Sequence, residues 1–116
     1  MARQGSTFVS SKTAVAALIF ALGAAFSAHA AASLTTMGNI GDANKASRLI
    51  QHYTLDGSKR VMEATAAAPD GISEDVIRKV TIQTAHGICA DPRGAGWTLR
   101  VFLPNQSEPV ATCRFR

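Results

Sequence analysis

The two cysteines, Cys89 and Cys113, are the residues whose chemistry the sequence defines best. A thiol pair can form a disulfide, bind a metal or carry redox activity. Metal and redox pairs have close CxxC spacing or a surrounding His/Cys cluster, and these two residues have neither. We therefore predict a structural disulfide between Cys89 and Cys113. It would close a loop of about 25 residues and stabilise the fold by about 3–4 kcal/mol on the chain-entropy estimate.

The histidines and carboxylates form no evident catalytic group. His52 lies in a predicted strand and His86 on the polar side of a predicted helix, so we expect both on the surface. A zinc site would need three or four ligands, which two separated histidines and a disulfide do not supply. An enzyme would need His52, His86 and an acid such as Glu63 to converge. We predict no catalytic residue, no metal site and no cofactor.

Two short motifs have structural interpretations. The RGAG segment at residues 93–96 has two glycines but neither the length nor the Lys-Ser/Thr ending of a phosphate loop, so we interpret it as the turn into a strand. The turn-forming connector after residue 103 is a candidate contact loop, because small inhibitors can present one loop to a target cleft. Its residues are Pro104, Asn105, Gln106, Ser107, Glu108 and Pro109.

Residues 1–30 have the pattern of a cleaved signal peptide. Basic residues precede an uncharged apolar run over residues 14–26, and an Ala-x-Ala pattern places cleavage between Ala30 and Ala31. The run of about 13 residues falls short of the ~20 that a membrane-spanning helix needs, so we expect no stable membrane insertion after cleavage. The Ala-rich pattern is typical of bacteria and predicts a periplasmic or secreted protein. A eukaryotic secretory origin stays open.

The remaining chain is long enough for one small domain. Cleavage would remove two of the 12 basic residues and lower the formal net charge from +4 to about +2. The other basic residues are scattered, without interleaved aromatics, so we expect no nucleic-acid partner. Residues 31–45 have small and polar side chains without a sustained period, and we expect a flexible N-terminal segment there. Met37 and Ile40 could still dock. Residues 46–116 are the predicted domain.

Two structures compete over residues 46–55. Ala46, Leu49, Ile50 and Tyr53 have helical spacing, which predicts a helix of about three turns. Alternatively, the Asp56-Gly57 turn joins two strands over residues 47–55 and 59–67, since both flanks can alternate. In the first of these strands, one face would carry Leu49, Gln51, Tyr53 and Leu55. We favour the hairpin because the helix would leave the second strand without a partner.

A helix is predicted within the segment from Ile72 to Pro92. Ser73 is the expected N-cap, and the acidic residues Glu74 and Asp75 suit the positive end of the helix dipole. The predicted apolar face consists of Val76, Ile77, Val80, Thr81, Thr84 and Ile88, with Ala85 and Cys89 on its edge. The opposite stripe consists of Asp75, Lys79, Gln83 and His86.

Two further strands alternate apolar and polar residues over 97–103 and 109–115. Their short connector predicts an antiparallel hairpin, in which Cys113 faces the helix. Hairpin, helix and hairpin together predict an α+β domain: a four-stranded antiparallel sheet with one helix packed on one face. A disulfide would join the helix end to the last strand.

The sequence Cys-Ala-Asp-Pro at residues 89–92, between a short amphipathic helix and a C-terminal hairpin, resembles small exported bacterial proteins of uncharacterised families. The resemblance covers about Ser47 to the C-terminus. It implies the same layout and an exported protein, and it implies no activity.

These observations predict a non-enzymatic binding or accessory protein of the bacterial cell envelope. Its partner would be another protein or an envelope component, which would contact the uncovered sheet face or an edge strand. The alternatives are a small enzyme inhibitor or a small hydrolase. The oligomeric state stays open.

Overall fold

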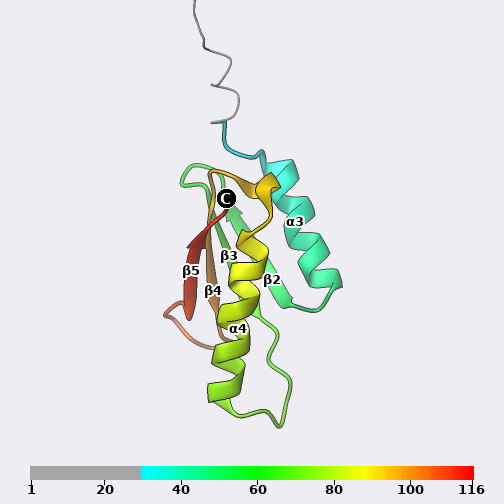
Figure 1. Cartoon of the computed structure of the whole chain (residues 1–116), viewed down its shortest axis with the longest axis vertical. Helices are drawn as coiled ribbons and strands as arrows, with labels where there is room; N and C mark the ends of the chain where they lie inside the picture. The colour runs from blue at the N-terminus through cyan, green and yellow to red at the C-terminus, as the bar shows by residue number, and fades with distance from the viewer. Residues whose placement is uncertain (1–29) are drawn as a thin grey trace, which may run out of the picture. The chain divides into compact units, whose positions relative to one another are not determined.

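The computed structural model describes residues 30–116 of the chain. The predicted signal peptide lies outside the described residues, apart from Ala30, so the peptide and its cleavage stay predictions. Residues Ala31–Arg116 form one compact unit, drawn in colour in Figure 1.

This unit is built from a helix, a hairpin, a second helix with a short 3-10 turn, and a second hairpin. The bounds are α3 Leu34–Ala46, β2 Ile50–Asp56, β3 Val61–Ala66, α4 Glu74–Cys89, η2 Pro92–Gly94, β4 Thr98–Phe102 and β5 Ala111–Arg114. The strands form one four-stranded sheet in the order β2-β3-β4-β5. The predicted α+β fold with a four-stranded sheet is confirmed.

The sheet is mixed rather than purely antiparallel. β2 and β3, and likewise β4 and β5, form the two predicted antiparallel hairpins, but β3 and β4 run parallel. The physical reason is that α4 returns the chain across the sheet to the end where β3 began. The next strand must then run in the same direction as β3, as in any helical crossover between neighbouring strands.

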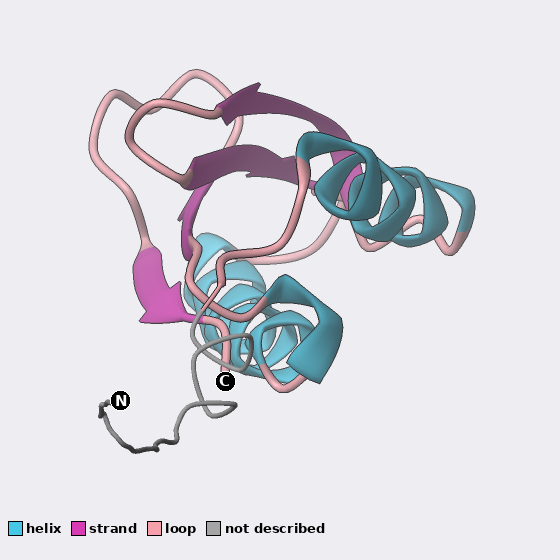
Figure 2. Ribbon diagram, turned by 90° about the horizontal axis from the view of Figure 1, so that it is seen from above, coloured by secondary structure: helices cyan, strands magenta, loops and turns pink. Residues whose placement is uncertain are grey.

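Helix α3 corrects the expectation of a flexible segment over residues 31–45. The Ser33 hydroxyl caps it by accepting a 3.1 Å hydrogen bond from the amide of Thr36. Met37 and Ile40 are fully buried against the sheet. Both α3 and α4 lie on the same side of the sheet (Figure 2), α3 over β2 and α4 over β4 and β5.

The glycines of α3 concealed the helix in the sequence because glycine lowers helix propensity. Gly41 faces the ring of Tyr53, and a Cβ at this position would lie 2.5 Å from two atoms of that ring. The Tyr53 hydroxyl also donates its one proton to Asp42 Oδ1 at 2.7 Å, and it lies 3.0 Å from the carbonyl oxygen of Gly38. The close approach of β2 therefore requires a glycine in the helix.

The hairpin is the correct alternative for residues 46–67, since α3 ends at Ala46 and β2 begins at Ile50. The predicted grouping of Leu49, Gln51, Tyr53 and Leu55 on one face is only partly correct. The β2–β3 register shifts between Ile50 and His52, and such a bulge changes which residues face the core. Ile50 is therefore buried, whereas Leu49 and Gln51 are exposed. Tyr53 and Leu55 share a face as predicted, and both pack against the core.

Helix α4 begins as predicted, with the Ser73 hydroxyl accepting a 3.4 Å hydrogen bond from the amide of Val76. Its predicted apolar face is wrong in part. Val76 and Val80 are 48% and 53% exposed, and the buried residues are Thr81, Ala85, Ile88 and Cys89. Ala85, Ile88 and Cys89 lie in the C-terminal half of the helix, and Thr81 is the last residue of the N-terminal half.

Length explains this difference. A helix of 16 residues is about 24 Å long, and the five residues of β4 span about 17 Å. Figure 1 shows the first turns of α4 extending beyond the ends of β3 and β4. The N-terminal half of the helix therefore has less sheet to pack against, and its valines remain exposed.

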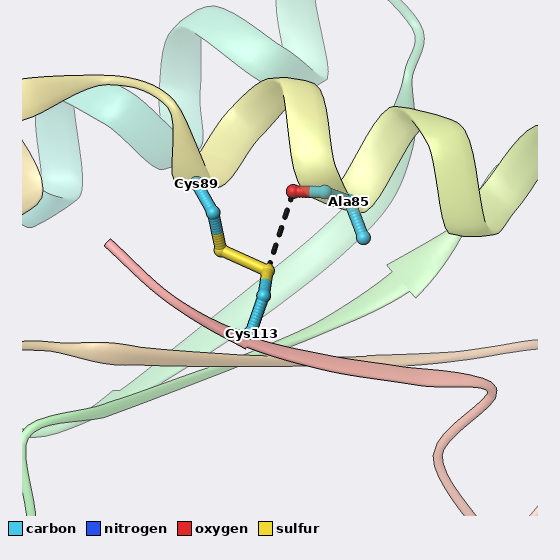
Figure 3. Close-up of a disulfide and its surroundings, with 3 residues drawn as sticks. All are labelled: Ala85, Cys89 and Cys113. Atoms are coloured by element: carbon cyan, nitrogen blue, oxygen red, sulfur yellow. Dashed lines mark hydrogen bonds between the residues drawn. A yellow bond between two sulfur atoms is a disulfide. The ribbon is translucent and has the colours of Figure 1, made fainter. Parts of the chain in front are cut away.

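The predicted disulfide between Cys89 and Cys113 is confirmed (Figure 3), and it joins the last residue of α4 to β5. The Cys113 sulfur lies 3.4 Å from the carbonyl oxygen of Ala85, a contact in which the oxidised sulfur has no proton to donate. The Arg116 amide donates a 3.1 Å hydrogen bond to the Cys89 carbonyl oxygen. Together with the small Ala85 side chain, these contacts hold the C-terminal half of α4 close to β5.

The alternation predicted for the third strand is confirmed. Trp97, Leu99, Val101 and Leu103 are all buried, at 5% exposure or less. They form the centre of the core together with Met37, Ile40, Met62, Ala64, Ile88 and Phe115.

Candidate functional site

The three residues that a catalytic site would require do not converge. His52 and Glu63 line one shallow hollow on the uncovered face of the sheet. The Glu63 carboxylate is engaged there in an ion pair of 2.6 Å with Arg100. His86 is exposed on α4, which packs on the opposite face of the sheet. Within residues 30–116, no three His, Cys, Asp or Glu side chains are grouped as metal ligands would be.

Other polar residues that could have been functional have structural roles. Ser73 caps α4. Asp91 caps η2 and forms an ion pair of 2.6 Å with Arg93, and the hydrogen bond from this guanidinium lowers the pKa of Asp91. Residues 93–96 form the turn into β4, as predicted. Their chemistry is therefore accounted for by the fold.

The uncovered face of the sheet is polar. Two hollows on this face, of about 280 and 320 Å³, are lined by His52, Thr54, Glu63, Thr65 and Arg100 among others. Its one aromatic ring, Phe102, lies under the Arg100 guanidinium, 5.3 Å from carbon to ring centroid. Such a face is stable in water, because an antiparallel or mixed sheet commonly leaves one side solvated.

A different kind of surface lies at the end of the sheet where β3 and β4 finish. Because these strands are parallel, their carboxyl ends lie side by side at the same end of the sheet. The loop 67–73 follows β3 there, and the loop 103–110 follows β4. Helix α4 also begins at this end of the sheet (Figure 1), so both loops lie near its first turns.

Two neighbouring hollows, of about 220 and 270 Å³, lie along the first half of α4 and share Ile72 and Ile77. We call them together the α4 groove. Its apolar lining consists of Ala67, Ala68, Pro69, Ile72, Val76, Ile77, Val80, Leu103 and Pro104, and its polar lining of Glu74, Thr81 and Gln106.

Three large side chains of the α4 groove are unusually open to solvent. Ile72 is 48% exposed, Val76 is 48% exposed and Val80 is 53% exposed. Val76 and Val80 are about one helical turn apart on one side of α4, and Ile72 lies just before the N-cap Ser73. Together they form an apolar ridge along the groove. The same spacing caused the prediction that Val76 and Val80 belong to the core. Spacing identifies a shared face and does not tell whether the protein itself covers it.

The candidate contact loop, Pro104 to Pro109, borders this groove. Pro104 and Gln106 line the groove, and Gln106 with Asn105 also lines the hollow that contains His52. Asn105 has a φ of 62°, and the Gln106 amide donates a 3.2 Å hydrogen bond to the Leu103 carbonyl oxygen. The loop therefore lies between the apolar groove and the polar sheet face, and its role in binding stays a prediction.

Comparisons with known proteins identify no relative. No family model matches the chain, and neither the search of curated proteins nor that of solved structures gave a match. In the part of the chain that the structure describes, no helix has the length and apolar character needed to span a bilayer.

Proposed function

We propose that this chain is a small exported binding or accessory protein of the bacterial cell envelope, without enzymatic activity, that holds another protein in the α4 groove. The observation that carries the proposal is the ridge of Ile72, Val76 and Val80, which is half exposed beside the apolar residues of two loops. Large contiguous apolar surfaces on small proteins commonly mark interaction sites.

The groove is a better contact surface than the uncovered sheet face. On that face Glu63 and Arg100 already form an ion pair with each other, and the Phe102 ring lies under Arg100. Burial of the half-exposed Val76 and Val80 side chains would remove apolar area from water and so favour association. The groove also includes part of the loop 104–109, the contact loop predicted from sequence.

Export is supported by the signal-peptide pattern of residues 1–30 and is compatible with the disulfide, because disulfides persist in oxidising compartments. Protein recovered from the periplasm or the medium should begin at Ala31 and contain no free thiol. A full-length chain retained in the cytoplasm would contradict this part of the proposal.

Site-specific photo-crosslinking tests the contact surface. A photoreactive side chain at Val80 should give a discrete protein adduct in cells, and the same group at Thr54, on the uncovered sheet face, is the matched control. A second change in the groove, Val76→Asp, should abolish the adduct at position 80. Equal adducts at both positions, or none at position 80, would exclude the groove as the binding surface.

An enzyme inhibitor is the second candidate, because the loop 104–109 presents four consecutive exposed residues, Asn105 to Glu108, between two prolines. The mature protein can be assayed against envelope proteases and cell-wall hydrolases. Replacing these four residues by alanine should abolish any inhibition found. Unchanged inhibition would exclude the loop.

A further inference from the structure

We infer that the α4 groove receives an apolar protein segment flanked by Lys or Arg side chains. This inference rests on the proposed function and names the class of partner. It follows from the charge of the residues that surround the groove together with its apolar lining.

The surroundings of the groove are acidic in a basic protein. The chain has 12 basic and eight acidic residues, and half of the acidic ones lie in the two loops and the first turn of α4. These are Asp70, Glu74, Asp75 and Glu108. The segments that line the groove, residues 67–81 and 103–110, contain these four acidic residues and two basic ones, Arg78 and Lys79, so their formal charge is −2, four minus two, in a chain of net charge +4. The groove therefore differs in charge from the rest of the domain.

Helix capping accounts for only part of this acidity. Glu74 and Asp75 suit the positive end of the helix dipole, and Glu74 also pairs with Arg78 at 3.2 Å. Asp70 and Glu108 lie in separate loops, so the dipole does not explain them. Asp70, Asp75 and Glu108 take part in none of the ion pairs found within residues 30–116. After Arg78, the next basic residue of α4 in the sequence is Lys79.

The acidic residues near the groove, which we call the acidic rim, also favour one kind of occupant over others. An anionic lipid surface would be repelled by these carboxylates. A second copy that used the same groove would form a two-fold interface, which places the same patch of both copies together and so brings acidic rim against acidic rim. A partner segment with basic flanks meets neither repulsion.

The dimensions fit a short segment. The helical part of the ridge, from Val76 to Val80, rises about 6 Å along α4, and Ile72 extends the ridge beyond the N-cap. Two or three apolar side chains of a partner can contact such a ridge. The flanking Lys or Arg side chains would then reach Asp70, next to the lining residue Pro69, and Glu108 on the neighbouring loop.

Selection from a random peptide library tests this inference without knowledge of the partner. Phage-displayed peptides of about 16 residues are selected on the processed exported protein and depleted on its Val76→Asn/Val80→Asn variant. Both valines are half exposed, so this variant should fold, which circular dichroism can verify. We expect enriched peptides to contain clustered apolar residues with adjacent Lys or Arg.

Synthetic forms of the enriched peptides are then measured against three variants. Binding should weaken about tenfold or more in the valine variant, which corresponds to about 1.4 kcal/mol. It should weaken about two- to fivefold in Asp70→Asn/Glu108→Gln, as expected for exposed charge pairs, and should fall with added salt. Thr54→Asn on the uncovered sheet face should leave binding unchanged.

Several results would overturn the inference. These are enrichment of acidic or uncharged peptides, absence of any enriched peptide, and binding that is unchanged in the carboxylate variant. Two further results would identify a different occupant of the groove. Capture of the protein by phosphatidylglycerol vesicles would indicate a lipid surface, and a dimer in sedimentation would indicate a second copy, provided that the Val76→Asn/Val80→Asn variant loses the effect. If photo-crosslinking at position 80 still identifies a protein partner, the proposed function stands and only the partner class is wrong. If neither experiment gives a groove-dependent partner, both fail.

Discussion

The indole nitrogen of Trp97 donates a 2.7 Å hydrogen bond to the carbonyl oxygen of Ala32. Ala32 is the second residue after the predicted cleavage site, and its amide donates a 3.0 Å hydrogen bond to the Ala95 carbonyl oxygen. Trp97 is buried at 2% exposure in the centre of the core. These bonds attach the start of the domain to the turn before β4 and hold the chain that leads into α3.

Replacing Trp97 by Phe tests this attachment. The change keeps an apolar ring but leaves the Ala32 carbonyl oxygen without its donor, which should lower the free energy of unfolding by about 1–3 kcal/mol. Urea denaturation of the processed protein measures the loss. Deleting residues 31–32 as well should add little, because both changes remove the same hydrogen bond. Fully additive losses would show that Trp97 acts through packing alone.

Two glycines in helices should respond in opposite ways to alanine. At Gly41 a Cβ would lie 2.5 Å from the Tyr53 ring, so Gly41→Ala should destabilise the protein by about 1–3 kcal/mol. At Gly87 no atom lies within 4 Å of the added Cβ, so Gly87→Ala should stabilise it by about 0.5–1 kcal/mol through helix propensity. Thermal unfolding of both variants measures the contrast. A loss at both positions would indicate that Gly87 is also needed for packing.

Tyr53 should titrate above its ordinary pKa of 10.0, chiefly because its hydroxyl donates a hydrogen bond to Asp42. A pKa raised by folding means that the stabilising contribution is complete below pH 10.0 and is lost as the pH rises through the folded value. Tyr53 is the only tyrosine of the chain, so the ultraviolet absorbance of the phenolate reports this residue alone. Asp42→Asn should shift the titration downward. A titration identical in the folded protein and in urea would contradict the bond.

The difference in burial between the two halves of α4 can be tested with two alanine substitutions. Ile88 is 6% exposed, so Ile88→Ala should destabilise the protein by about 2–5 kcal/mol. Val80 is 53% exposed, so Val80→Ala should change the free energy of unfolding by less than about 0.5 kcal/mol. Chemical denaturation measures both. A large loss at Val80 would mean that its side chain is covered within the protein, and the groove would not be open.

Reduction should release two thiols and destabilise the domain. Treatment with a reductant should raise the intact mass by two hydrogens, and the loss of the Cys89–Cys113 link should cost about 3–4 kcal/mol. A Cys89→Ala/Cys113→Ala variant should match the reduced protein. If this variant were as stable as the oxidised chain, contacts such as that of Arg116 with the Cys89 carbonyl would hold α4 in place without the disulfide.

Local patterns in the sequence determined much of this fold. The cap at Ser73, the hairpin around Asp56-Gly57 and the alternation from Trp97 to Leu103 are correct, because each depends on residues close together in the chain. The cysteine pair was predictable because the chain has only two cysteines. The composition of the loop 104–109 identified it as a connector, and nothing local could tell what lies beside it.

Only the tertiary structure decided the features that depend on distant residues. Helix α3 needs a glycine at position 41 because the Tyr53 ring, 12 positions away in the chain, occupies the space of a side chain. The parallel pairing of β3 and β4 follows from where α4 returns the chain. The groove exists because the sheet ends before the helix does, which leaves Val76 and Val80 uncovered. Periodicity placed these valines on an apolar face, and the lengths of the packed elements decided that this face remains open.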